Sequence, residues 1–163
     1  MSFRKFFIIA IICALCFIIE ILLGNLLGRW FKPNLILIAI VFFNLSWGTR
    51  YGLAAAIIGG LMKDSFSANF FGLNIFSLLS CAYLITFIRK YVYHVGSQAG
   101  RVKMVVIIVI LNVTIQVLVK VALSYVNIGQ AFHYVFLPEV IATTVLAGYT
   151  FDKLKRCVSN LFV

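Results

Sequence analysis

Charge is scarce in this sequence, and negative charge is the scarcest of all. Only 11% of the 163 residues are charged, and four Asp or Glu stand against fourteen Lys or Arg. Soluble domains carry charge on about a quarter of their residues, so this shortage excludes an ordinary soluble fold. Because 64% of the residues are hydrophobic, we predict an all-α integral membrane protein whose single polytopic domain covers residues 1–163.

Residues able to carry catalysis or to bind a metal are also few. The two histidines, His94 and His133, are expected on opposite sides of the membrane, and so are Asp64 and Asp152. The four cysteines lack the spacing of a metal or redox site, and neither an HExxH motif nor a glycine-rich phosphate loop is present. We therefore predict no enzyme activity, no cofactor and no metal site.

Long apolar segments are what the sequence does contain, and they predict a six-helix bundle. Its second and third members are shorter than the about 20 residues that cross a bilayer. These short members lie in thinned bilayer, are shielded by neighbouring helices, or form a re-entrant hairpin. The first segment is expected to be retained rather than cleaved as a signal. The helices are expected at residues 6–27, 34–47, 50–63, 71–88, 103–123 and 134–151.

The distribution of positive charge predicts the topology. With a cytoplasmic amino terminus, ten Lys or Arg fall inside, three fall outside, and Lys120 lies in the outer part of the fifth helix. Short cytoplasmic loops retain positive charge during insertion, so both termini are expected inside. The net charge of +10 then lies mostly beside hydrophobic helices, where anionic lipids rather than nucleic acid are the expected counter-charge.

Small residues recur every four positions along the third segment. Gly48, Gly52, Ala56 and Gly60 place nearly bare backbone on one slowly drifting helix face, which Asp64 closes. In lipid, such a face lets another helix approach closely. From the sequence it is either an internal packing surface or a docking surface for a partner protein.

Asp64 is also open to two interpretations. In the first interpretation, Asp64 is an ordinary charge at a helix end beside Lys63, since placing an acid at the membrane interface costs little free energy. Alternatively, it pins the outer loop by accepting backbone hydrogen bonds, which fixes the approach of Gly72 and the fourth helix.

Three further charges, Glu20, Lys120 and Glu139, lie within apolar runs or at their outer ends. Charges inside a membrane are costly unless they are paired or hydrated. A tight hairpin between the fifth and sixth helices would bring Lys120 and Glu139 to similar depths, so we hypothesise an ion pair between them, with Glu20 as the competing partner. The alternative is that each side chain reaches water separately.

Several segments together resemble a known family. KPN and an aliphatic helix occupy 32–48, and the stretch 51–74 is a glycine-rich helix that ends in an acid before a loop and a Phe-Gly turn. An aromatic helix end with a basic residue follows at 83–89, and LPEV opens the last helix at 137–140. In order and spacing these features resemble the bacterial rod shape-determining protein MreD family, over most of 33–156.

The resemblance implies a function that involves no catalysed reaction. Such proteins are non-enzymatic subunits of the rod complex, or elongasome, in the bacterial cytoplasmic (inner) membrane, where they help to organise lateral peptidoglycan synthesis and cell shape. The implied partner is the bitopic protein MreC and, through it, MreB, RodA and a penicillin-binding transpeptidase. The small-residue face and the outer polar residues are the surfaces expected to meet such a partner; the outer polar residues are Glu20, Asp64, Lys120 and Glu139.

The same resemblance brings an alternative function. The family is similar in fold to the substrate-binding S components of energy-coupling factor vitamin transporters, which also have about six helices with short members. Those proteins dock their coupling subunit through an Ala-xxx-Ala pattern, which Ala10 and Ala14 supply here. Polar residues of the fourth and fifth helices would then line a ligand pocket, or else form hydrogen bonds between helices: Asn74, Ser77, Ser80, Asn112 and Gln116.

Overall fold

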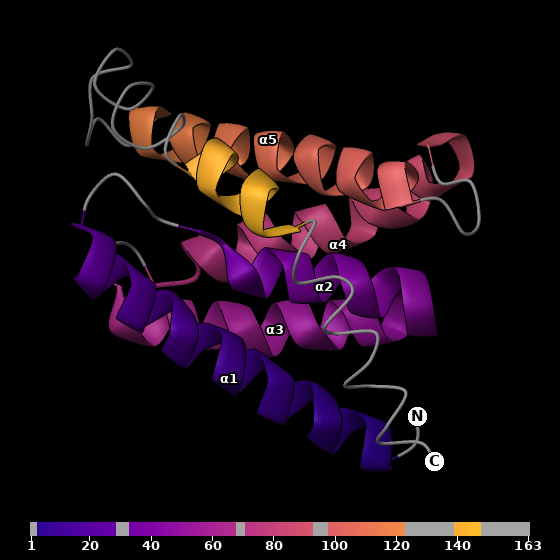
Figure 1. The fold of residues 1–163 in the computed structure, drawn as a ribbon, viewed down its shortest axis with the longest axis horizontal. Helices are drawn as coiled ribbons and strands as arrows, with labels where there is room; N and C mark the ends of the chain where they lie inside the picture. The colour runs from indigo at the N-terminus through magenta and orange to yellow at the C-terminus, as the bar shows by residue number, and fades with distance from the viewer. Residues whose placement is uncertain (1–2, 29–32, 68–70, 93–97, 123–138, 148–163) are drawn as a thin grey trace.

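The computed structural model describes residues 3–28, 33–67, 71–92, 98–122 and 139–147, and every regular element within these ranges is helical (Figure 1). A helix without a label covers 139–147, and the ends predicted for it at 134 and 151 lie outside the described residues. The predicted all-helical class is therefore confirmed. The labelled helices are α1 (Phe3–Leu27), α2 (Leu35–Trp47), α3 (Thr49–Phe66), α4 (Leu73–Val92) and α5 (Gln98–Ala122).

The short helix α2 forms the centre of the bundle. Every residue from Leu35 to Leu45 is buried, and α1, α3, α4 and α5 all contact this helix. Neighbouring helices therefore shield α2. This is one of the three arrangements that we expected for the short segments.

A single residue joins α2 to α3. Gly48 has a φ of +98°, which lies in the left-handed region that favours glycine. Its amide donates to the Asn44 carbonyl, and its own carbonyl accepts from the amides of Tyr51 and Gly52. The chain thus reverses without a loop, and the two helices lie side by side as a hairpin (Figure 1).

The glycines of α3 make internal packing contacts. A Cβ added at Gly52 would lie 2.7 Å from Asn44 Nδ2 on α2, and one at Gly60 would lie 2.7 Å from the Ile75 Cα on α4. Ala56 is fully buried between them. Gly48 does not belong to this face, because a Cβ there meets nothing within 4 Å and its role is conformational. The face that could have docked a partner is occupied by α2 and α4.

Two helices in the described part of the chain are long and apolar enough to cross a membrane, Arg4–Leu26 and Lys103–Ala122. Shorter apolar helices cover Leu35–Trp47 and Leu73–Arg89. Helix α1 crosses the α2–α3 hairpin obliquely at the edge of the bundle and keeps one apolar face exposed (Figure 1).

Candidate functional site

Most of the polar contacts between helices gather at one end of the bundle, where α1 and α3 finish and α2 and α4 begin. Two groups can be distinguished there. We call the hydrogen bonds of Asp64 the loop lock, and we call Glu20, Lys63, Asn34 and Glu139 the charged cluster.

In the loop lock, the carboxylate of Asp64 fastens the start of α4 to the end of α3. Asp64 is 3% exposed, and its Oδ2 accepts from the backbone amides of Gly72 and Ile75 at 3.0 and 3.1 Å. Its Oδ1 accepts from the backbone amide and the side-chain amide of Asn74 at 3.1 and 2.9 Å. The first amides of a helix have no partner within the helix, so an acid from another helix supplies what a capping residue would.

The geometry selects the second of the two interpretations of Asp64. The acid accepts the backbone hydrogen bonds that fix Gly72 and the fourth helix. Gly72 has a φ of +101°, so the turn that presents its amide to the carboxylate needs a residue tolerant of this conformation. Both oxygens of Asp64 carry two hydrogen bonds, which leaves this carboxylate fully committed to the fold.

The polar residues of α4 and α5 bond to one another. Gln116 Nε2 donates to Asn74 Oδ1 at 3.3 Å, and Ser77 donates to the side-chain oxygen of Asn112 at 2.5 Å. Ser80 donates to a carbonyl of its own helix. The alternative in which these side chains hydrogen-bond between helices therefore describes four of the five.

In the charged cluster, Glu20 on α1 forms an ion pair with Lys63 on α3. The distance from Lys63 Nζ to Glu20 Oε1 is 2.7 Å, and the side chains are 13% and 20% exposed respectively. The rings of Phe17 and Phe66 pack with centroids 5.2 Å apart and also join these two helices. Glu20 Oε2 is buried and has no hydrogen-bond partner in the described part of the chain.

Asn34 connects this ion pair to the final helix. Its Oδ1 accepts from Lys63 Nζ at 2.9 Å and from the backbone amide of Leu37 at 3.1 Å, which caps α2. Its Nδ2 donates to Glu139 Oε1 at 2.8 Å, and its backbone amide donates to the Thr143 hydroxyl at 2.9 Å. One residue thus joins α2, α3 and the helix at 139–147.

The pairing expected between Lys120 and Glu139 is wrong. Glu139 bonds to Asn34 and Glu20 pairs with Lys63, and among the described residues no ion pair involves Lys120. Similar depth is necessary for a pair, but the two side chains must also face each other around the helix axes. Asn34 is not among the predicted site residues, although an Asn directly after a proline and before an aliphatic helix is a capping signal.

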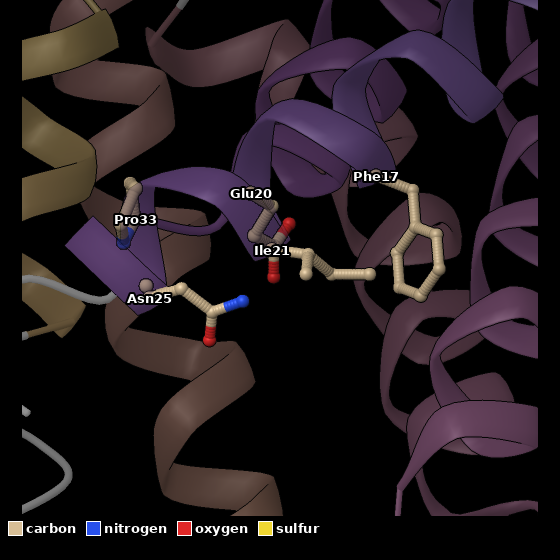
Figure 2. A pocket seen from close by; sticks show the side chains of 6 residues that line it. Phe17, Glu20, Ile21, Asn25 and Pro33 are labelled. Carbon is tan, nitrogen blue, oxygen red and sulfur yellow. The ribbon is translucent and has the colours of Figure 1, made fainter. Parts of the chain in front are cut away.

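A cavity of about 350 Å³ opens beside this cluster. Figure 2 shows the Glu20 carboxylate and the Asn25 carboxamide directed toward the same open space, with Phe17 on the far side. Its lining residues are Phe17, Glu20, Ile21, Gly24, Asn25 and Pro33.

The opposite end of the bundle is held by different contacts. Lys5 Nζ lies 5.6 Å from the ring centroid of Trp47 and 5.4 Å from that of Tyr51. The hydroxyls of Thr49 and Thr86 lie 3.0 Å apart and link α3 to α4. These contacts join helix ends, and the described residues that make them include no acid.

Neither polar group has the composition of a reactive centre. No set of three or more His, Cys, Asp or Glu within reach of one metal ion occurs among the residues that the structure describes. The thiols of Cys13 and Cys81 lie 3.9 Å from the carbonyls of Ala55 and Ile108 in the packed interior. What the polar end can do chemically is to accept and donate hydrogen bonds and to balance charge.

Comparison with known protein families gives a match that covers most of the chain. The family model described as rod shape-determining protein MreD matches residues 1–151. No curated protein matches and no solved structure matches.

Proposed function

We propose a function from one premise, which is that the chain belongs to the MreD family of rod shape-determining proteins. Membership makes it a membrane protein of the rod-shape machinery. From this we infer that it is a non-enzymatic, multi-pass subunit of the cell-elongation complex in the bacterial cytoplasmic membrane, with both termini in the cytoplasm. It binds an MreC-like bitopic protein and helps to organise lateral peptidoglycan synthesis.

The observation that carries this proposal is the family match over 1–151, and the geometry is compatible with it. The carboxylate of Asp64 accepts four hydrogen bonds from the start of α4. The ammonium group of Lys63 donates to Asn34 and forms an ion pair with Glu20. These groups stabilise a scaffold. No comparison supports the alternative of a vitamin-transporter S component.

The packing restricts where a partner can bind. Because α2 and α4 cover the small-residue face of α3, we place partner contacts on exposed apolar side chains of α1 and α4. Leu22 on α1 is 53% exposed and Tyr83 on α4 is 70% exposed. In lipid, a partner helix gains affinity from close packing and hydrogen bonds, because lipid tails are as apolar as the side chains they would leave.

The first test is a pull-down of the tagged full chain from its native membrane in gentle detergent, with the bound proteins identified by mass spectrometry. We expect an MreC-like bitopic protein together with wall synthases, and an untagged strain is the control. Recovery of paired ATPases with a coupling subunit would contradict the proposal and identify a vitamin-uptake component.

The second test maps the contact. A photo-crosslinking amino acid is placed at Leu22, at Tyr83 or at Leu118, which is 63% exposed on α5. We expect a cross-link to the bitopic partner from at least one of the first two positions. A cross-link from Leu118 alone would place the contact on α5 and refute the assigned surface.

A further inference from the structure

We propose that the membrane-spanning helix of the partner protein docks on α4 and accepts a hydrogen bond from the Tyr83 hydroxyl inside the hydrocarbon layer. The inference rests on the proposed function, which supplies a bitopic partner, and it adds the chemistry of the contact. The partner helix must carry a side chain with an acceptor oxygen, as Asn, Gln, Ser or Thr does, at the depth of Tyr83.

The first support is the depth of Tyr83 along α4. Tyr83 lies six residues before Arg89 (89 minus 83) and ten residues after Leu73 (83 minus 73), within an apolar stretch that runs from Leu73 to Arg89. At 1.5 Å per residue, these separations are about 9 and 15 Å. An aromatic side chain on a helix points back toward the amino-terminal end, so the hydroxyl is directed away from Arg89 and into the apolar stretch. The hydroxyl therefore lies within the hydrocarbon layer rather than at its boundary.

The second support is that this hydroxyl faces outward without a partner. Tyr83 is 70% exposed, and no hydrogen bond joins its hydroxyl to another residue in the described part of the chain. A hydroxyl in an apolar medium without a hydrogen bond is costly, because no water is present to replace the missing partner. The exposed ring is thus accompanied by a donor that requires an acceptor.

Hydroxyls at exposed or partly buried positions elsewhere in the helices avoid this cost locally. Ser80, Thr114 and Thr144 each donate to the carbonyl four residues earlier in the same helix, at 2.7 to 2.8 Å. These side chains are short enough to reach their own backbone. The hydroxyl of Tyr83 is at the far end of a ring and cannot do so. Its hydrogen bond needs an acceptor that α4 does not provide.

Tyr51 shows the usual arrangement of a tyrosine in a membrane protein. It lies in the first turn of α3, where its ring packs against Trp47 with centroids 5.7 Å apart and lies 5.4 Å from Lys5 Nζ. Tyrosine and tryptophan are enriched at the boundary of the membrane, where the ring meets lipid and the polar tip meets water. Tyr83 departs from this arrangement, and the departure marks α4 as the helix with an unmet polar contact.

The third support is the shape of the face around Tyr83. Phe76 is 60% exposed and lies seven residues before Tyr83 (83 minus 76), so both rings project from the same side of α4, about two turns apart. Ser80 lies between them, and its hydroxyl already donates to the Phe76 carbonyl. Large side chains on either side of a small one are the knobs and hole of helix packing. The face fits a second helix that presents small residues opposite the two rings.

The missing acceptor distinguishes a helix from lipid as the occupant of this face. An acyl chain can cover the rings of Phe76 and Tyr83, but the ester and headgroup oxygens of a lipid lie at the boundary of the hydrocarbon layer. A spanning helix can present a polar side chain at any depth. The bitopic partner of the proposed function has such a helix.

Photo-crosslinking from Phe76 in native membranes locates the contact. This position lies on the same face and leaves the Tyr83 hydroxyl in place. We expect a cross-link to the membrane-spanning segment of the bitopic partner, and we expect none from Leu118 on α5. No cross-link from Phe76 would overturn the inference, and a cross-link from Leu22 on α1 in the same experiment would leave the proposed function standing.

Tyr83→Phe tests the hydrogen bond, because this variant removes the hydroxyl and keeps the ring. The purified full chain and the bitopic protein recovered with it are labelled for energy transfer and combined in phosphatidylcholine vesicles. We expect the Kd to rise about threefold to tenfold, which corresponds to one hydrogen bond between helices in a membrane. Ser80→Ala and Thr114→Val are matched controls that remove hydroxyls bonded to their own helix, and they should leave the Kd unchanged. An unchanged Kd for Tyr83→Phe would overturn the proposal.

A further variant separates a lost donor from disturbed packing. With 4-aminophenylalanine at position 83, the ring again ends in an N–H donor, so we expect the Kd to return to within about twofold of that of the unmodified chain. Thermal denaturation of each variant without the partner should match that of the unmodified chain, since Tyr83 is 70% exposed. Association that stays weak with 4-aminophenylalanine would overturn the assignment of Tyr83 as the donor.

Discussion

Two carboxylates at the same end of the bundle are used in opposite ways. Asp64 is 3% exposed and accepts four hydrogen bonds through both of its oxygens. Glu20 is 20% exposed, and only one of its oxygens has a partner among the described residues. The comparison shows how an acid with both oxygens satisfied holds the backbone of the fold, whereas a partly exposed acid joins two helices through a single ion pair.

The difference between them originates in the helices that carry them. Helix α3 contacts α1, α2 and α4, so an acid near its end finds the amides that begin α4. Helix α1 lies at the edge of the bundle and keeps one face exposed (Figure 1). An acid on α1 forms an ion pair with a single cation on α3.

Removal of the satisfied acid should have the largest effect. Asp64→Ala leaves three backbone amides and the Asn74 side chain without their acceptor, so we expect a loss of about 3 to 5 kcal/mol in the free energy of unfolding. Denaturant unfolding in detergent micelles measures this loss. Ser65→Ala is the matched control, since Ser65 is exposed and bonds only to its own helix. Equal stability of the two variants would disprove the structural role of Asp64.

A pair of glycines sharpens the contrast between packed and open helix faces. Gly60→Leu places a Cβ 2.7 Å from the Ile75 Cα and must separate α3 from α4, at a cost of about 2 to 3 kcal/mol. Gly24→Leu adds the same side chain where a Cβ meets nothing within 4 Å, and it should change stability by less than about 0.5 kcal/mol. Thermal denaturation of both variants in the same detergent is the measurement. Similar melting temperatures would refute this assignment of the two faces.

A smaller loss of stability than at Asp64 or Gly60 is expected in the charged cluster. Lys63→Met removes the cation that Glu20 and Asn34 share, and we expect a loss of about 1 to 2 kcal/mol because both members of the ion pair retain some exposure. The double variant Glu20→Met with Lys63→Met removes the uncompensated acid and should recover most of this loss. A double-mutant cycle by denaturant unfolding tests this, and strictly additive losses would show that the pair is not coupled.

The features that could be predicted from the sequence are those set by the order and spacing of residues along the chain. The two short neighbouring helices, the glycine spacing and the acid that ends α3 all follow from periodicity and from local chemistry. The hydrogen bonds of Asp64 agree with one of the two interpretations of this residue, the acceptor role. Close packing at Gly52 and Gly60 agrees with one of the two alternatives for this face, which is packing within the bundle.

The sequence could not predict which way side chains face around different helices. Lys120 and Glu139 have similar expected depths, yet Glu139 bonds to Asn34. The pairing of Lys63 with Glu20 joins residues 43 positions apart (63 minus 20), and only the crossing of α1 over α3 brings them together. Asn34 joins three elements that no local pattern connects. Tertiary geometry thus decides the charged cluster.

The enclosed helix α2 has a consequence for how the protein enters the membrane during its synthesis. Its 13 residues make a rod of about 20 Å, shorter than the about 30 Å of a hydrocarbon core. If this helix left the translocation channel alone, the unpaired backbone groups at its ends would lie within the hydrocarbon core. With α3 attached through one glycine, the two can leave the channel together as a hairpin, so insertion of the second helix should wait until the ribosome has made the third.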